Sequence, residues 1–267
     1  MKRAFLLCLL LPLIALAQTG SGEGFQPVAG QPGKDVVWVP TPYALVEKML
    51  DMARVTPQDY VIDLGSGDGR NVIAAAKRGA RALGVEYNAE MVDLSRRNAQ
   101  KEGVTERARF VEGDMFEADI SQATVLALFL LPDNLRKLTP KFASLKPGTR
   151  LVLNGFPIPG WDPDVTEQAA GECGNWCTSH LYIAPAKVAG TWRLPQGTLR
   201  LEQSYQVLSG TLNKAPISNA RLKGEEISFS IDGAQYQGRV NGNAMSGEVK
   251  GARSGLWQAT RMGSHDH

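Results

Sequence analysis

The chain is poor in the residues that build metal and redox centres, because its 267 positions hold three histidines and three cysteines. His180 is the one histidine within the body of the sequence, and His265 and His267 lie in the C-terminal tail. We predict that this tail, 263–267, is disordered and solvated. So few imidazole and thiolate ligands predict no metal site.

A long hydrophobic run is also missing. The most extended apolar stretch, Ala4–Leu16, is short for a membrane span. It follows Lys2 and Arg3 and ends in the small-residue pattern Ala15–Ala17, which is typical of a secretory signal peptide. We therefore predict a signal peptide over 1–17, no transmembrane segment in the mature chain, and export to the periplasm or the medium.

The predicted mature chain has no excess of charge of either sign. Removing Lys2 and Arg3 leaves 27 basic residues against 27 acidic ones. A formally neutral body gives no electrostatic case for nucleic acid or an anionic membrane as partner. The hydrophobic content of 43% and the charged content of 21% are ordinary for a folded protein.

The cysteines that remain after cleavage form one pair. Cys8 lies in the predicted signal peptide, which leaves Cys173 and Cys177 as an even number in an oxidising compartment. We predict a small-loop disulfide between them. The alternatives are a redox pair, which usually has two intervening residues instead of three, and half of a metal site.

The most informative stretch is Tyr60–Arg70, which has the sequence Y-V-I-D-L-G-S-G-D-G-R. Three apolar β-formers lead into Asp63 and then into glycines at every second position, and an alanine-rich helical pattern follows over 71–77. A strand, glycine turn and helix in this order let a ligand lie against bare backbone at the helix N-terminus. The spacing G-x-G-x-G differs from the dinucleotide fingerprint G-x-G-x-x-G, which argues against a nicotinamide cofactor.

Two further acidic residues end the next two predicted strands. The stretch 81–86 predicts strand two, and its last residue, Glu86, comes 23 positions after Asp63. At about this distance α/β nucleotide sites place a carboxylate on ribose hydroxyls. The stretch 110–115 ends strand three with Asp114.

These three stretches together resemble the cofactor motifs of the class I S-adenosylmethionine-dependent methyltransferases. The resemblance implies an α/β fold with a Rossmann-like seven-stranded sheet, methyltransferase activity, and S-adenosyl-L-methionine as cofactor. It also implies that Glu86 holds the ribose and that Asp114 and Met115 meet the adenine. The residues of the glycine turn would surround the methionine part: Asp63, Gly65, Ser66, Gly67, Asp68 and Gly69.

A narrower resemblance comes from Val39–Pro42, before a predicted helix, together with the following D-L-G-S-G-D-G-R. Over about 35–161 the chain is similar to the protein-lysine N-methyltransferases that modify the rotor-ring subunit of ATP synthase and the adenine-nucleotide carrier. This resemblance implies that Thr41, Pro42 and Tyr43 lie beside the transferable methyl group. The alternative is that they only start a helix, with Thr41 as its cap. The chain differs from that family by its predicted signal peptide and its C-terminal extension.

The acceptor side is expected beyond the ends of strands four and five, since ligands of open α/β sheets bind at the carboxyl ends of the strands. The apolar stretch 123–131 predicts strand four, a central parallel strand, and 150–154 predicts strand five. We therefore predict Phe129, Pro132 and Asn154 on the acceptor side. No residue is assigned as a catalytic base. A sixth strand is predicted over 180–184.

From Gly190 onward the pattern changes to short strands of alternating polarity. Asp232-Gly233 and Asn241-Gly242 are strong hairpin signals, and Trp192 and Trp257 are expected to share one core. We predict a small antiparallel all-β meander or barrel. Because residues 190–262 contain no His, no Cys and no clustered acids, we interpret them as a binding or packing module.

The predicted function is an exported S-adenosylmethionine-dependent methyltransferase that acts on an unknown acceptor, with a protein lysine or another nitrogen as first candidate. Because S-adenosylmethionine is made inside the cell, the alternatives are an exported adenosine-ligand binding protein and a non-catalytic scaffold with the methyltransferase fold. No oligomeric state is predicted. The expected organisation is a signal peptide (1–17), a flexible linker (18–34), a methyltransferase domain (35–187), a small antiparallel β domain (188–262) and a disordered tail (263–267).

Overall fold

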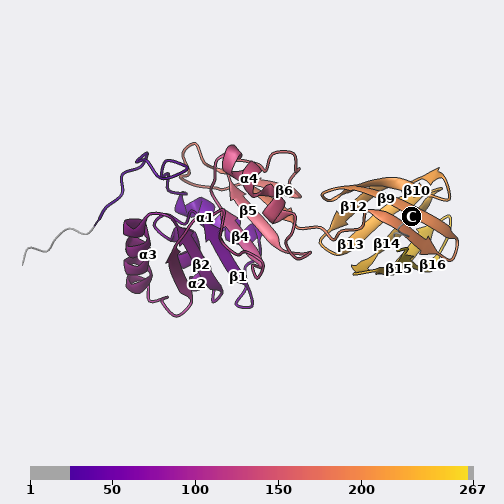
Figure 1. Cartoon of the computed structure of the whole chain (residues 1–267), viewed down its shortest axis with the longest axis horizontal. Coiled ribbons are helices and arrows are strands. Elements are labelled where there is room, and N and C mark those ends of the chain that lie inside the picture. Colours follow the sequence, from indigo (N-terminus) through magenta and orange to yellow (C-terminus); the bar gives the residue numbers. More distant parts are fainter. Residues whose placement is uncertain (1–24, 264–267) are drawn as a thin grey trace, which may run out of the picture.

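Two lobes lie end to end in the molecule, one of mixed helices and strands and one of strands alone (Figure 1). The computed structural model describes residues 25–263, so the predicted signal peptide over 1–17 lies outside the described residues. The first sheet ends at Ile183 and the second begins at Gly190, on either side of the predicted boundary between 187 and 188.

Seven strands form the first sheet, in the order β3-β2-β1-β4-β5-β7-β6. Strand β7 is antiparallel to both its neighbours, and the remaining pairs are parallel. The predicted Rossmann-like seven-stranded sheet is confirmed. Its strands are β1 (Tyr60–Leu64), β2 (Arg81–Glu86), β3 (Ala108–Glu112), β4 (Val125–Leu128), β5 (Arg150–Asn154), β6 (Val165–Gln168) and β7 (Thr178–Ile183).

Strand β6 is the element that the sequence pattern does not identify. The stretch predicted as the sixth strand over 180–184 belongs to β7, the seventh. All four residues of β6 are exposed, so the strand has no apolar face and no period-two alternation. It lies at the edge of the sheet, next to β7, where a strand can form without being buried on either side.

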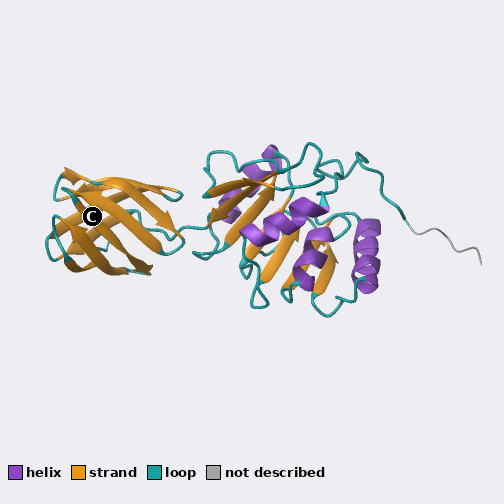
Figure 2. Cartoon of the chain, turned by 180° about the vertical axis from the view of Figure 1, so that it is seen from behind, coloured by secondary structure: helices purple, strands orange, loops and turns teal. Residues whose placement is uncertain are grey.

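The four helices among the described residues lie on the two faces of this sheet (Figure 2). Successive residues of a strand point to opposite faces, and β4 shows this clearly: Val125 and Ala127 pack in one apolar cluster, and Leu126 and Leu128 in another. Helices α1, α2 and α3 contribute to the first cluster and α4 to the second. The helices are α1 (Tyr43–Met52), α2 (Arg70–Lys77), α3 (Ala89–Lys101) and α4 (Pro132–Phe142).

The helix caps differ between α3, which has a side-chain cap, and α1, where the predicted cap is wrong. Asn88 caps α3, because its side-chain oxygen accepts hydrogen bonds from the N–H groups of Glu90 and Met91. Thr41 does not cap α1; Pro42 holds the N-cap position, without a side-chain hydrogen bond. The Thr41 hydroxyl instead accepts from Asn154 Nδ2, 3.3 Å away, so a tertiary contact replaces the local one.

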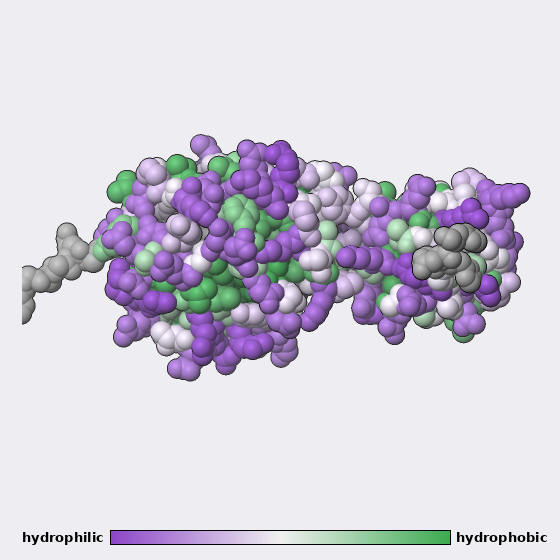
Figure 3. All heavy atoms as spheres, in the orientation of Figure 1, coloured by the Kyte–Doolittle hydropathy of each residue, from purple (hydrophilic) through white to green (hydrophobic). Residues whose placement is uncertain are grey.

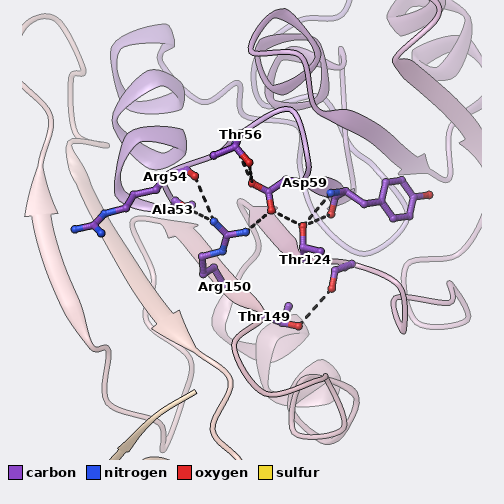
Figure 4. A network of polar contacts seen from close by, with 9 residues as sticks. Ala53, Arg54, Thr56, Asp59, Thr124, Thr149 and Arg150 are labelled. Atoms are coloured by element: carbon purple, nitrogen blue, oxygen red, sulfur yellow. Dashed lines mark hydrogen bonds and ion pairs between the residues drawn. The ribbon is translucent and has the colours of Figure 1, made fainter. Parts of the chain in front are cut away.

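A polar network ties the starts of β1, β4 and β5 together (Figure 4). The Asp59 carboxylate accepts from Thr124 Oγ1 at 2.7 Å and from the N–H of Thr56 at 2.8 Å, and it pairs with Arg150. Burial raises the pKa of Asp59, but these hydrogen bonds and the Arg150 charge outweigh it and hold that pKa below its usual value. The network holds together the amino ends of these strands, and the glycine turn follows the carboxyl end of β1.

The second sheet closes into a barrel. Its order is β11-β10-β12-β13-β14-β15-β16-β8-β9, and β9 also pairs with β10, so eight antiparallel strands form a ring while β11 pairs with β10 alone. Of the two predicted forms, meander or barrel, the barrel is present. The strands are β8 (Gly190–Leu194), β9 (Gly197–Ser204), β10 (Val207–Leu212), β11 (Ala215–Pro216), β12 (Ser218–Lys223), β13 (Glu226–Ile231), β14 (Ala234–Asn241), β15 (Ala244–Gly251) and β16 (Gly255–Arg261).

Aromatic side chains fill the inside of the barrel. The rings of Phe229 and Tyr236 stack with their centroids 4.6 Å apart, and Trp257 meets both edge-on at 5.7 and 5.8 Å. Trp192 and Trp257 belong to one buried cluster, as predicted. An eight-stranded barrel is just wide enough for side chains to fill it, and these residues make the interior a packed core.

The barrel contacts the α/β domain at segments next to β5 and β6. Trp161 stacks on Tyr205 of the barrel with ring centroids 4.7 Å apart, and Arg221 pairs with the buried carboxylate of Asp164 at 3.0 Å. Gly224, in the turn between β12 and β13, lies against the turn that precedes β5.

The surfaces of the two lobes differ as well. In Figure 3 hydrophobic atoms gather over the middle of the α/β domain, whereas the visible face of the barrel is mostly hydrophilic. Within residues 25–263 we find no helix with the length and apolar character needed to cross a membrane.

Candidate functional site

The glycine turn between β1 and α2 has a backbone that other residues rarely adopt. Gly65, Gly67 and Gly69 have φ values of +73°, +55° and +84°, in the left-handed region that favours glycine. A Cβ on Gly67 would lie 2.7 Å from the indole nitrogen of Trp38. Glycine is therefore favoured at these positions by the backbone conformation of the turn and, at Gly67, also by the close contact with Trp38.

Glu86, at the end of β2, holds this turn in place. One carboxylate oxygen accepts from the N–H of Gly67 and the other from the N–H of Asn88, both at 2.9 Å. A carboxylate has about four acceptor positions, so both oxygens can still accept hydrogen bonds from a ligand. The acid predicted from spacing thus lies directly beside the turn.

Asp63 is a buried carboxyl group at the end of β1, with 3% of its surface exposed. Asn71 Nδ2 donates to it at 3.1 Å. Burial raises the pKa of Asp63 well above its ordinary value, and the nearby charges of Glu86 and Asp68 raise it further. A buried acid with such a pKa is typical of functional sites.

Asp114 lies across the site from the turn, after β3. Its carboxylate accepts from the N–H of Phe116 at 2.8 Å and binds Lys34 Nζ at 2.5 Å. The hydrogen bond from Lys34 lowers the pKa of Asp114. Met115, the next residue, is buried.

A cavity of about 220 Å³ opens between these residues and the segment that precedes α1. We call residues 30–39 the N-terminal strap. The strap is folded back on itself, because Gly30 N donates to Trp38 O at 2.8 Å and Trp38 N donates to Gln31 O at 2.9 Å. The last residues of the predicted linker thus form one wall of the cavity. Residues predicted for the cofactor that line it are Gly65, Glu86, Asp114 and Met115.

A smaller hollow adjoins this cavity on the other side of Trp38. It is lined by further residues predicted for the cofactor, namely Asp63, Gly65, Ser66, Gly67 and Asp68. Gly69 lines neither space. Trp38, Gly65 and Phe129 line both, so the cavity and the hollow are two parts of one site.

The residues predicted for the acceptor side divide into two groups. Thr41 lines the small hollow, Phe129 lies where the two spaces meet, and Asn154 is buried in contact with Thr41. Pro42, Tyr43 and Pro132 line neither space. Tyr43 is 69% exposed and Pro132 is the first residue of α4.

A family model described as the ANTKMT methyltransferase domain matches residues 63–165 of the chain. A protein-lysine N-methyltransferase from Saccharolobus islandicus (strain REY15A) is 45% identical over 152 residues, which are 55% of this chain and 93% of that protein. The chain belongs to the ANTKMT methyltransferase family. It is an S-adenosylmethionine-dependent methyltransferase.

Other family relatives are longer than the shared region. The adenine nucleotide translocase lysine N-methyltransferase of Mus musculus is 37% identical over 120 residues, which are 44% of this chain and 52% of that protein. This chain therefore spans about half the length of that relative.

A solved structure of an RNA methyltransferase from Salinibacter ruber, in complex with S-adenosyl-L-homocysteine, is 43% identical with a TM-score of 0.52. The match covers 56% of this chain and 96% of that one.

The residues of this ANTKMT-family site fit S-adenosylmethionine. The glycine turn leaves bare backbone, and Glu86 offers acceptor positions suited to hydroxyl groups. Two buried side-chain atoms at the turn, Ser66 Oγ and Asn71 Oδ1, have no hydrogen-bond partner within the described residues. Because such atoms are rare in folded proteins, they indicate a place where a polar ligand binds. The individual roles of these residues remain predictions.

Several residues at the site carry no signal in the sequence. Lys34 and Trp38 come from a segment of unremarkable composition and reach the site through tertiary contacts. Arg70 ends the glycine motif without a predicted role, yet its Nη1 donates to Thr41 O at 2.6 Å and its guanidinium pairs with Asp68. It thereby joins the glycine turn to the residues that start α1.

The predicted disulfide between Cys173 and Cys177 is present. The loop it closes lies between β6 and β7 and carries Trp176 to the main cavity. The sequence predicts the bond, but it does not predict that this loop takes part in the site.

Proposed function

We propose that this chain is a protein-lysine N-methyltransferase that acts outside the cytoplasm. The observation that carries the proposal is the 45% identity across 93% of a protein-lysine N-methyltransferase. The structure supports it through the site at the carboxyl ends of β1, β2 and β3, where Gly65, Glu86 and Asp114 line the main cavity.

The charges around the site support a lysine acceptor over RNA. The comparison is needed since a solved structure of similar identity is described as an RNA methyltransferase. RNA binding depends on cations that neutralise phosphates. Among the residues that line the two spaces, the cations are Lys34 and Arg70, and each is paired with an acid, Asp114 and Asp68. A site without unpaired lining cations favours a lysine side chain over a polyanion.

The residues can serve methyl transfer chiefly by positioning. When bound, S-adenosylmethionine supplies a sulfonium methyl group that an acceptor lone pair displaces in line, so alignment is the main requirement. Asn154 is 1% exposed and its Oδ1 has no hydrogen-bond partner within the described residues. It lies in contact with Thr41, and this oxygen can accept a hydrogen bond from an amine and orient it. The apolar residues nearby lower the pKa of an ammonium group, which favours loss of its proton.

The test is a methyl-transfer assay with the chain from Gln18 to His267, S-adenosylmethionine and three acceptor pools: lysine-rich peptides, envelope proteins and total RNA. Mass spectrometry then locates the methyl group. We expect it on lysine Nζ, and none with Glu86→Ala. Methyl groups on RNA nucleotides alone would disprove the lysine assignment, and lack of S-adenosylhomocysteine binding would disprove the cofactor site.

Export is proposed from Lys2, Arg3 and the apolar run Ala4–Leu16. The Cys173–Cys177 disulfide supports it, because disulfides persist in oxidising compartments. A fusion of residues 1–30 to alkaline phosphatase, which is active only after export, tests this separately. An inactive fusion, with a standard signal peptide as positive control, would contradict export without affecting the methyltransferase proposal.

A further inference from the structure

The Cys173–Cys177 loop is held in one shape by covalent and main-chain bonds. The disulfide joins its two ends, and inside it Trp176 N donates to Cys173 O at 2.9 Å. At its base, Ala169 N donates to Cys177 O at 2.8 Å. Trp176 is therefore placed by the disulfide loop and not by a helix or strand of its own.

The indole of Trp176 packs on bare backbone at the end of β5. Gly155 has a φ of +72°, and a Cβ on this residue would lie 3.0 Å from Trp176 Cε3. Two further rings complete the contact. The centroid of Trp176 is 5.1 Å from that of Phe129, after β4, and 5.5 Å from that of Phe156, after β5.

These three rings form what we call the aromatic wall: Phe129, Phe156 and Trp176. All three line the main cavity. The charged residues that line the same cavity, Lys34, Asp35, Glu86 and Asp114, belong to the strap or to the ends of β2 and β3. The wall comes from the ends of β4 and β5 and from the disulfide loop, whereas the charged residues come with Trp38 and Tyr87 from the other side of the lining.

We propose that the aromatic wall binds the alkyl stem and ammonium group of the acceptor lysine, and that the Cys173–Cys177 bond keeps Trp176 in this wall. The inference rests on the proposed function and names the part of the site that recognises the acceptor. Aromatic faces attract cations, and tryptophan does so most strongly. The same rings bury the methylene stem.

The binding test uses the chain from Gln18 to His267, purified oxidised and saturated with S-adenosylhomocysteine. Nα-acetyl-lysine amide, its Nε-trimethyl form and the neutral Nα-acetyl-norleucine amide are titrated in turn and followed by saturation-transfer NMR. We expect both cations to bind at least fivefold more tightly than norleucine amide. Trp176→Ala should weaken binding of the trimethyl form about tenfold, the size of one partly desolvated cation–π contact. Trp176→Phe should restore most of this affinity.

The matched control is Asn175→Ala, which changes the neighbouring exposed residue in the same loop and should leave the affinity for the trimethyl form unchanged. The disulfide is tested with Cys173→Ser/Cys177→Ser and with dithiothreitol. Dithiothreitol supplies two electrons and two protons, which convert the S–S bond into two thiols, and it becomes a cyclic disulfide. Both treatments should weaken the lysine amides as much as Trp176→Ala does, while S-adenosylhomocysteine affinity changes less than twofold.

Failure of the inference and failure of the proposed function give different results. If S-adenosylhomocysteine binds but norleucine amide binds as well as the lysine amides, the wall does not recognise a cation and the inference is wrong. If the Cys173→Ser/Cys177→Ser variant keeps full affinity for the lysine amides, the proposal that the disulfide holds Trp176 in the wall is wrong. If S-adenosylhomocysteine itself does not bind the folded wild-type chain, the proposed function fails and the inference fails with it.

Discussion

The α/β domain and the barrel bury different kinds of side chain. Of the eleven buried polar or charged residues among 25–263, ten lie between Thr41 and Ser179 and only Gln206 belongs to the barrel. Gln206 donates to the carbonyl of Asp162, so even this residue serves the junction with the α/β domain. The barrel is built for packing, whereas the α/β domain places polar groups in its interior.

The buried atoms without a hydrogen-bond partner sharpen this contrast. Within the described residues the six such side-chain atoms all lie between Ser66 and Ser179, and three belong to Ser66, Asn71 and Asn154 at the site. An unpaired buried polar atom costs stability. Such a cost is expected where a ligand will supply the missing partner, and the barrel shows no comparable place within its described residues.

The largest expected effect is on the barrel core. Trp192 is fully buried, so Trp192→Ala should lower the free energy of unfolding of the barrel by about 3–5 kcal/mol. Urea titration followed by far-ultraviolet circular dichroism measures it. The affinity for S-adenosylhomocysteine should change less than twofold, because the cavity lining lies entirely between Gln31 and Trp176.

The matched control for Trp192→Ala is Leu256→Ala, on the same barrel but 87% exposed, which should cost less than about 0.5 kcal/mol. If cofactor affinity collapsed in Trp192→Ala while the α/β domain stayed folded, the separation of packing and site between the two regions would be wrong.

The next effect belongs to the site. Glu86→Ala removes a carboxylate that accepts from two backbone N–H groups and faces the cavity, so S-adenosylhomocysteine affinity should fall about 100-fold, or roughly 2–3 kcal/mol. Titration calorimetry measures it. The matched control is Glu112→Ala, since Glu112 is the register partner of Glu86 on β3 and is exposed. Equal losses in both variants would show a general charge effect.

Asp63→Asn is expected to increase the free energy of unfolding, by less than the changes above. Because burial raises the pKa of Asp63 in the folded state, the ionised group costs stability. That cost begins near the ordinary pKa of 3.8, grows as the pH rises through the raised pKa, and is then constant. Asparagine has no such charge and can still accept from Asn71.

Asp63→Asn should therefore raise the free energy of unfolding at neutral pH by roughly 1–2 kcal/mol, and the gain should disappear as the pH falls toward 4. Urea titrations of both proteins across this range measure it. A gain that is independent of pH would show that the charge of Asp63 is not its cause.

The smallest effect is expected at the N-terminal strap. Lys34 joins the strap to Asp114, and the pair is partly exposed. Lys34→Ala should speed release of S-adenosylhomocysteine about two- to fivefold, as loss of a surface ion pair does, measured by stopped-flow displacement. Lys48→Ala removes another lysine ion pair, with Glu167, away from both spaces, and should not change the rate. Slower release in Lys34→Ala would mean that Lys34 competes with the ligand for Asp114.

Sequence patterns predict structure well where residues close together in the sequence determine it. The spacing of Gly65, Gly67 and Gly69 predicts a glycine turn, and each of these residues has a positive φ there. The alternation of apolar residues from Leu199 to Trp257 predicts strands with one buried face, and they have it. Both depend on backbone sterics or on side-chain direction within a few residues, which the sequence contains directly.

Other features of the molecule depend on contacts between distant parts of the chain. Lys34 meets Asp114 across 80 positions, and Asn154 meets Thr41 across 113. Three further features have no local sequence pattern that predicts them. They are the pairing of β9 with β10 that closes the barrel, the position of the exposed strand β6, and the contact of Trp176 with Phe129. Local sequence patterns were enough to predict most of the elements, the glycine turn and the disulfide, but not strand β6. The residues that line the site are brought together by tertiary packing. Periodicity in the sequence reports only local structure, so it does not show which distant residue a side chain will contact.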